Sequence, residues 1–166
     1  MFQFQPLHSS HFKILFDWLK EPHVKAWWGP GENWDDFDSR HQAMISSSLV
    51  FPHIVFLETN PIGYINYWFV EEDHDFKPHF PKNTVGTDQF IGNPHLIGNG
   101  MGTRFVRQFT NELLHKPDIG LIITDPDPMN LAAIRSYEKA GFTKTRLMET
   151  SEGNVQLLEK AIPTAD

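Results

Sequence analysis

Cysteine is absent from the 166 residues of this sequence. Disulfide bonds, thiolate metal sites and a cysteine nucleophile are therefore excluded. Basic residues are also scarce, because 14 Lys and Arg stand against 21 Asp and Glu, for a formal net charge of -7. A protein that binds nucleic acid needs a basic face to displace counterions from phosphates, so this function is not expected. The acidic balance is compatible with a small cationic substrate.

Long apolar runs are missing as well. No stretch approaches the roughly 20 apolar residues that a membrane-spanning helix needs. Residues 1–10 have neither the basic start nor the apolar run of a secretory signal. We therefore expect no membrane association and a cytoplasmic location. Hydrophobic residues still make up 40% of the chain. That composition and length suit one globular domain over residues 1–166, as a monomer or a homodimer.

The first half of the chain predicts helices followed by strands. Apolar spacing and turn residues define these expected elements. They are a helix over 10–20 capped by Ser9, a short turn from Pro22, a helix from a cap at Asp38 to Leu49, strands over 53–57 and 62–70, a loop over 71–82, and a third strand over 84–91.

The second half alternates helices and strands. Its expected elements are a glycine turn at 98–102, an amphipathic helix containing Phe105 to Leu114, a strand over 119–124, a helix over 130–139 followed by Gly141 at its C-terminus, and strands over 142–149 and 155–160 joined by a turn at 151–154. This order predicts an α/β or α+β fold, with a mixed central sheet flanked by helices.

The glycine turn directly precedes a helix, which suggests an anion-binding site. Glycines let a backbone approach a ligand closely, and the free N–H groups of a helix start suit phosphate or pyrophosphate. An ordinary flexible turn explains the same glycines equally well. A P-loop is not expected, because its Lys-Ser/Thr pair is missing. The residues expected to contact a phosphate ligand here are Gly98, Asn99, Gly100, Met101, Gly102 and Thr103.

The run Asp125 to Phe142 (DPDPMNLAAIRSYEKAGF) follows one helix and one strand later. Asn130 is a suitable N-cap, and Tyr137 lies seven residues on, near the same helix face. Taken alone, Tyr137 could equally be a half-buried core residue. Together with the glycine turn, this run resembles the hallmark of GNAT acetyltransferases. The resemblance implies the GNAT fold and acetyl-CoA as co-substrate, held in part by Asn130 and Tyr137.

Further segments resemble aminoglycoside 6'-N-acetyltransferases. They are residues 19–28 (LKEPHVKAWW), 61–64 (PIGY) and 86–89 (GTDQ), together with the spacing from Asp88 to Gly100. The resemblance covers about residues 15–160. Two departures stand out. Ile97 replaces the Arg or Gln that often opens the GNAT phosphate motif, and the loop after Val70 does not align cleanly.

The resemblance implies direct transfer of acetyl to an amine within a ternary complex. The missing cysteine agrees, because no thiol is present to carry the acetyl group. A backbone N–H near Phe90 and Ile91 is expected to polarise the thioester carbonyl. Tyr137 is expected to protonate the leaving thiolate. Asp88 is the candidate for binding the reacting amine and receiving its proton, although it could instead be an ordinary turn aspartate.

A polycationic acceptor needs several carboxylates, because each ammonium must be paired when it leaves water. The expected acceptor-binding residues are Trp27, Trp28, Asp73, Asp75, Asp88, Asp125 and Glu152. A solvated acidic surface and core packing of the tryptophans are the plainer explanations. The histidines lack the spacing of a zinc site, so no metal is expected.

Two other functions remain open at this stage. The acceptor could be another amine, such as a siderophore precursor or a protein N-terminus. Alternatively, the domain could bind acetyl-CoA without catalysis, as a sensor or interaction module. The presence of both Asn130 and Tyr137 argues against a degenerate domain.

Overall fold

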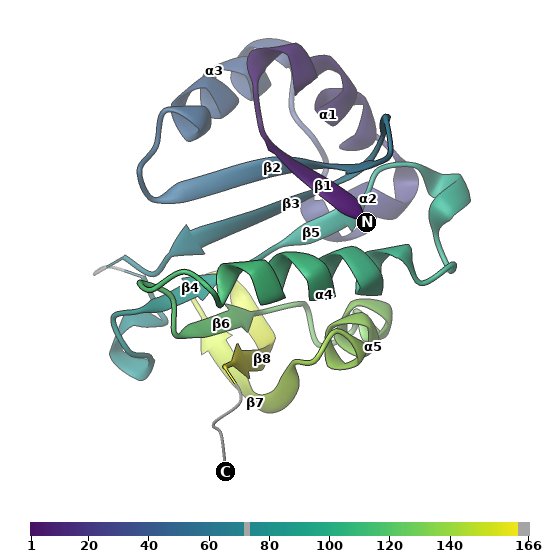
Figure 1. Cartoon of the computed structure of the whole chain (residues 1–166). Helices are drawn as coiled ribbons and strands as arrows, with labels where there is room; N and C mark the ends of the chain where they lie inside the picture. Colours follow the sequence, from purple (N-terminus) through teal and green to yellow (C-terminus); the bar gives the residue numbers. More distant parts are fainter. Residues whose placement is uncertain (72–73, 163–166) are drawn as a thin grey trace.

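The computed structural model of the chain describes residues 1–71 and 74–162. Its centre is an eight-stranded mixed sheet in the order β1-β2-β3-β4-β6-β8-β7, with β5 also paired to β3 (Figure 1). The strands are β1 (Phe2–Pro6), β2 (Val50–Leu57), β3 (Asn60–Phe69), β4 (Thr84–Gly86), β5 (Gln89–Ile91), β6 (Leu121–Thr124), β7 (Thr143–Thr150) and β8 (Gly153–Ala161). The helices are α1 (Phe12–Trp18), α2 (Pro22–Trp28), α3 (Trp34–Ile45), α4 (Met101–Leu113) and α5 (Leu131–Lys139), with short 3-10 turns η1 (Ser9–His11), η2 (Lys77–His79) and η3 (Pro94–Leu96).

Helices cover both faces of the sheet, as the fold class predicted. Neighbouring strand residues point to opposite faces, so Val55 and Ile65 pack under α4 and α5 while Ile54 and Tyr64 pack under α1, α2 and α3. The amphipathic α4 turns its apolar stripe, including Phe105, onto the first of these faces. No helix in the described part of the chain is long and apolar enough to cross a membrane.

The N-terminal part contains one unpredicted strand, and two expectations for it are wrong. Residues 2–6 form an unpredicted strand, β1, which pairs antiparallel with β2. Residues 22–28 form the helix α2 instead of a turn, since Pro22 occupies the first helical turn, where its missing N–H costs nothing. The helix expected from Asp38 begins at Trp34, because the Asn33 side chain accepts a hydrogen bond from the Asp36 N–H. Asp38 therefore lies inside α3 and caps nothing.

The helix expected over 10–20 is shorter than predicted. His8, rather than Ser9, caps a 3-10 turn that leads into α1. The expected 151–154 turn is also tighter, since β7 runs to Thr150 and β8 begins at Gly153. The other strand and helix predictions in the C-terminal half are confirmed, including the cap at Asn130 and the positive φ of Gly141.

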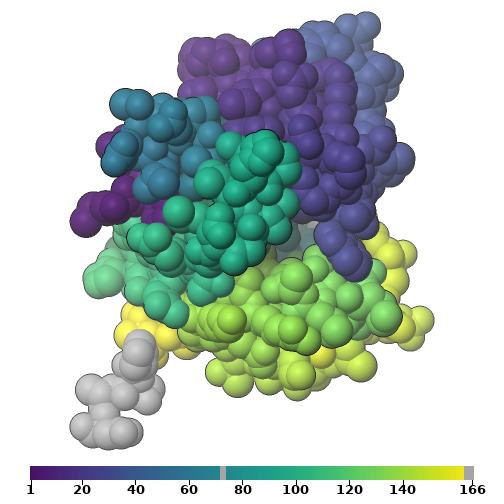
Figure 2. Space-filling view, turned by 90° about the vertical axis from the view of Figure 1, so that its right-hand side faces the viewer, coloured from purple at the N-terminus to yellow at the C-terminus, as the bar shows by residue number. Residues whose placement is uncertain are grey.

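The third predicted strand is interrupted, and this interruption creates the site. Its first part, β4, runs parallel to β6, and just beyond β4 the Thr87 N–H donates to the Ile123 carbonyl at 3.0 Å. Its second part, β5, stays with β3, and the structure describes no pairing of β5 with β6. The sheet therefore opens beyond Thr87. In the space-filling view, the purple-blue N-terminal part overhangs the green C-terminal part beside the teal segment (Figure 2).

Replacing Asn33 with alanine should lower the free energy of unfolding by about 1 kcal/mol, because the Asp36 N–H loses its acceptor. Chemical denaturation followed by circular dichroism measures the change. Asp38→Ala is the matched control and should stay within about 0.5 kcal/mol of the parent. An equal loss of unfolding free energy in both variants would contradict the assignment of Asn33 as the cap of α3.

Candidate active site

A pocket of about 260 Å³ lies where β5 and β6 separate. Three parts of the chain meet there: the end of α2, the ends of β4 and β6 with the residues that follow them, and the first turns of α5. The lining residues are Trp27, Trp28, Asp88, Gln89, Thr124, Asp125, Pro126, Asp127, Asn130, Ala133 and Tyr137. The sheet opening thus brings together Asp88 and Tyr137, which are separated by 48 residues of sequence (137 minus 88, less one).

Asp88 sits at the break between β4 and β5. Its N–H donates to the Asn66 side-chain oxygen at 2.9 Å, and its carbonyl accepts from the Asn66 N–H at 3.0 Å. The Trp68 indole N–H donates to its Oδ2 at 2.9 Å. Burial raises the pKa of the Asp88 carboxyl, and the hydrogen bonds from Trp68 and Asn66 oppose that rise. A raised pKa makes this carboxylate a stronger base than a solvated aspartate.

Tyr137 reaches the pocket from α5, whose start is fixed by the Asn130 cap at 3.2 Å from the Ala133 N–H. Its ring is 4% exposed and packs edge-on against Phe142. Burial raises the pKa of the phenol, and the nearby Asp88 charge raises it further. Tyr137 therefore keeps its proton at neutral pH, and its hydroxyl is available as a proton donor.

Asp125 follows β6 and borders two hollows. Burial and then the charge of Asp88 raise its pKa to about 7. On its other side lies a hollow of about 320 Å³, where four carboxylates gather around one histidine. Its lining residues are Glu71, His74, Asp75, Phe76, Asp125, Thr150, Ser151 and Glu152.

Within that hollow, the Ser151 N–H and hydroxyl both donate to Asp75, at 2.9 and 2.8 Å. These two bonds lower the pKa of the Asp75 carboxyl. The predicted Asp75, Asp125 and Glu152 thus come together, whereas the predicted Asp73 lies outside the described residues.

The outer edge of β5 presents backbone groups to the sheet opening. The Asn66 N–H bonds the Asp88 carbonyl and the Gly92 N–H bonds the Ile62 carbonyl. Because bonding alternates along an antiparallel ladder, the backbone groups of Gln89 and Ile91 face away from β3. The His23 ring hydrogen-bonds the Ile91 carbonyl oxygen, which lies 2.7 Å from Nε2. The Phe90 side chain is 7% exposed and packs with Trp18 and Trp28 instead.

The glycine turn ends at the N-terminus of α4. Gly98 and Gly100 have φ of 82° and 72°, values that side-chain-bearing residues rarely adopt. The first helical bond runs from the Arg104 N–H to the Gly100 carbonyl. The amides of residues 100–103 therefore have no partner inside the helix. A Cβ at Gly102 would meet Ile91 at 3.6 Å, so α4 starts directly beside β5.

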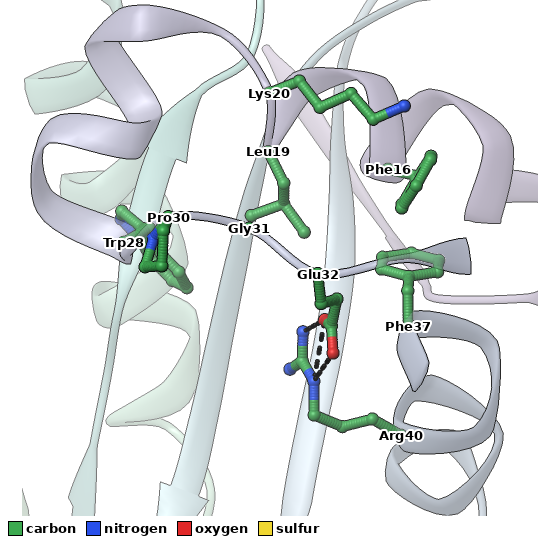
Figure 3. Close-up of a pocket in the computed structure, with 9 residues that line it drawn as sticks. All are labelled: Phe16, Leu19, Lys20, Trp28, Pro30, Gly31, Glu32, Phe37 and Arg40. Carbon is green, nitrogen blue, oxygen red and sulfur yellow. Dashed lines mark hydrogen bonds and ion pairs between the residues drawn. The ribbon is translucent and has the colours of Figure 1, made fainter. Parts of the chain in front are cut away.

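Trp27 and Trp28 are 48% and 39% exposed and form a wall rather than core. Trp28 is fixed edge-on against Phe90, with ring centroids 4.9 Å apart. Behind Trp28 lies a separate hollow of about 210 Å³, crossed by the ion pair of Glu32 and Arg40 (Figure 3). Trp28 thus divides the two hollows.

Several residues of the site carry no local sequence signal. The side chains of Gln89 and Thr124 hydrogen-bond Tyr137, and only their place beside Asp88 and Asp125 at strand ends could have indicated them. The contacts of His23, Asn66 and Trp68 join positions 20 or more residues apart, so no motif predicts them.

Comparison with known proteins finds similarity to acetyltransferases and to a kanamycin resistance protein. The acetyltransferase (GNAT) domain family matches residues 8–150. Aminoglycoside N(6')-acetyltransferase type 1 from Klebsiella pneumoniae is 34% identical over 146 residues, which span 84% of this chain and 73% of that protein. A kanamycin resistance protein from Rhizobium radiobacter is 44% identical over 68 residues, which span 41% of this chain and 63% of that protein.

A crystal structure of the aminoglycoside acetyltransferase AAC(6')-Ib with coenzyme A and kanamycin is also similar. Its TM-score to this structure is 0.90 at 28% identity, covering 97% of this chain and 95% of that one. The GNAT fold expected from the sequence is confirmed.

Asp125 should titrate with a pKa near 7, and Asp88→Asn should lower that pKa, because ionising Asp125 no longer places two negative charges together. Carboxyl-carbon NMR shifts followed against pH measure both values. Asp75 serves as internal reference and should titrate below its ordinary range in both proteins. An ordinary pKa near 4 for Asp125 in the parent would contradict the burial described here.

Proposed function

The chain belongs to the GNAT acetyltransferase family and is an N-acetyltransferase. From this premise we propose that it transfers the acetyl group of acetyl-CoA to the 6'-amine of an aminoglycoside. The observation that carries the proposal is the meeting of Asp88 and Tyr137 in one pocket, beside a hollow lined by further carboxylates. We assign the reaction to the whole chain, acting as one domain in the cytoplasm.

The residues present fit acetyl-CoA. Free amides at the start of α4 and the positive end of its dipole suit the negative phosphates. Among the described residues, no atom lies within 4 Å of a Cβ built at Gly98 or Gly100, so this turn leaves room for a ligand. Ile97 cannot donate a hydrogen bond from its side chain. Backbone N–H groups of this loop would therefore bind the phosphates. When bound, acetyl-CoA supplies the acetyl thioester.

The acetyl group belongs in the opening between β5 and β6. There the outward Ile91 amide is the donor suited to the thioester carbonyl, and a fixed donor of this kind stabilises developing negative charge. Phe90, whose backbone faces β3, supports this edge through packing. His23 fixes the Ile91 peptide by taking its carbonyl.

The acid and base roles follow from burial. The acceptor nitrogen forms a bond to the acetyl carbon as the carbon–sulfur bond breaks. Asp88, with its raised pKa, receives the proton that the amine loses. Tyr137, which keeps its proton, donates it to the departing sulfur. Holding both reactants in one pocket supplies much of the remaining acceleration.

The neighbouring hollow suits the other ammonium groups of a polycationic acceptor. Asp75, Asp125 and Glu152 each offer a carboxylate there, and Trp27 and Trp28 offer flat faces on the opposite side. Ammonium groups pair with carboxylates, and sugar rings pack on aromatic faces. A neutral or anionic amine would leave these carboxylates without a partner.

Release of coenzyme A thiol across a panel of amines tests the acceptor class. The panel contains kanamycin, an aminoglycoside whose 6' position bears a hydroxyl, spermidine, a lysine-type siderophore precursor and a peptide N-terminus. We expect turnover with kanamycin and little with the 6'-hydroxyl compound. Turnover of spermidine, the siderophore precursor or the peptide N-terminus without turnover of kanamycin would exclude an aminoglycoside acceptor.

Tyr137→Phe should lower kcat by about 10²- to 10⁴-fold, the usual contribution of one general acid. The Kd of acetyl-CoA should change little, because the ring and its packing are kept. Tyr67→Phe is the control, since Tyr67 is similarly buried but packs on Phe51 within the core. A kcat for Tyr137→Phe within a factor of two of the parent would leave this tyrosine a packing role only.

Asp88→Asn should strongly reduce acetylation of kanamycin, because it removes both an amine-binding charge and the proton acceptor. Affinity for acetyl-CoA should stay near the parental value.

Rising salt should weaken kanamycin binding to the parent, since part of that attraction is between charges. Asp118→Asn removes one exposed charge away from the pocket and serves as control. If Asp88→Asn acetylates kanamycin at the parental rate, Asp88 has no role in catalysis and is only a turn residue.

A further inference from the structure

The Trp68 side chain lies outside the pocket lining and donates a hydrogen bond to the Asp88 side chain. The Trp68 indole Nε1–H donates to Oδ2 at 2.9 Å from β3, the strand adjoining the break. A hydrogen bond to a charged acceptor is shorter and stronger than one between neutral groups. The orientation of the carboxylate therefore depends on where the indole lies.

The indole is held in place from two sides. Gly86 stands opposite Trp68 in the β3–β4 register, and a Cβ at Gly86 would lie 2.0 Å from the nearest ring atom. Only glycine lets the indole lie flat across β4 and reach Asp88. On the other side, His74 stacks on the indole with centroids 5.0 Å apart, and Phe76 follows at 6.4 Å.

The backbone of Asp88 is fixed by a different group. Asn66 bonds both its N–H and its carbonyl, while the Thr87 hydroxyl takes the Asn66 carbonyl at 2.6 Å. These contacts hold the peptide, and the peptide alone leaves the side chain free to rotate about χ1 and χ2. The indole bond to Oδ2, together with the Asn66 side chain, restricts that rotation.

We propose that Trp68 is a positioning residue of the acetyl transfer, which fixes the Asp88 carboxylate in its receiving orientation and favours its ionised form. This inference rests on the proposed role of Asp88. The N–H donor stabilises the carboxylate relative to the acid, so it opposes the effect of burial on the Asp88 pKa. Trp68 itself is not among the residues that line the pocket.

Trp68→Phe keeps an aromatic ring for the His74 stack and removes the N–H together with the second ring of the indole. We expect kcat for kanamycin to fall on the order of tenfold, as expected for a lost bond to a charged group. The KM for acetyl-CoA should be unchanged, and the Asp88 pKa should rise in carboxyl-carbon NMR. Trp34→Phe is the matched control, since Trp34 packs on Phe16 and Phe37 at the surface, and it should leave all three quantities unchanged.

A double-mutant cycle separates this proposal from the proposed function. If Trp68 acts through Asp88, Trp68→Phe should have no further effect on kcat in the Asp88→Asn background. A full additional loss in that background would overturn the positioning role. If Asp88→Asn alone keeps the parental rate, the proposed role of Asp88 fails first. If Asp88→Asn is impaired while Trp68→Phe is not, only the Trp68 proposal fails.

The parent protein offers a test that needs no variant to fold. The Trp68 indole proton resonance should shift with pH at the same midpoint as the Asp88 carboxyl carbon, because the bond strengthens as the carboxyl ionises. An indole proton that does not follow this titration would overturn the proposal.

Discussion

The parallel pairing of β4 with β6 ends at Gly86 opposite Ile123, and the site depends on where it ends. If the pairing continued, the backbone groups of Gln89 and Ile91 would hydrogen-bond to β6, and no space would remain between the strands. Because β5 stays with β3 instead, these groups face an opening. The segments that follow β4 and β6 then deliver Asp88 and Asp125 to the same place.

Burial in this opening assigns opposite tasks to groups that share it. It raises the pKa of carboxyls, which makes Asp88 a better proton acceptor and brings Asp125 to about 7. It also raises the pKa of the Tyr137 phenol, which keeps that group a proton donor. Burial therefore favours the protonated form of both groups, and in the proposed reaction the carboxylate accepts a proton while the phenol donates one.

The helix α2 joins the two sides of the proposed reaction. Near its start, His23 binds the Ile91 carbonyl on the edge that would meet the thioester. At its end, Trp28 forms the acceptor-side wall and packs on Phe90 of the same strand. Both contacts join α2 to β5, so packing holds the tryptophan wall and the strand edge in a fixed relation.

The sequence by itself determined the elements whose signals are local. Asn130 caps a helix and sets Tyr137 two turns later, and the glycine turn prepares the start of α4, because caps and turns depend on neighbouring residues. The same local rules misplaced a helix start at Asp38, since Asn33 competes as a cap and only packing decides between them. The sequence also marked Asp88 and Asp125 as candidates.

Only the tertiary structure decided what those candidates share. The break between β4 and β5, the Trp68 bond to Asp88, the His23 bond to Ile91 and the pKa of Asp125 all join residues far apart in the chain. Such contacts exist only in the folded chain, because burial and partner identity are properties of the fold rather than of any one segment.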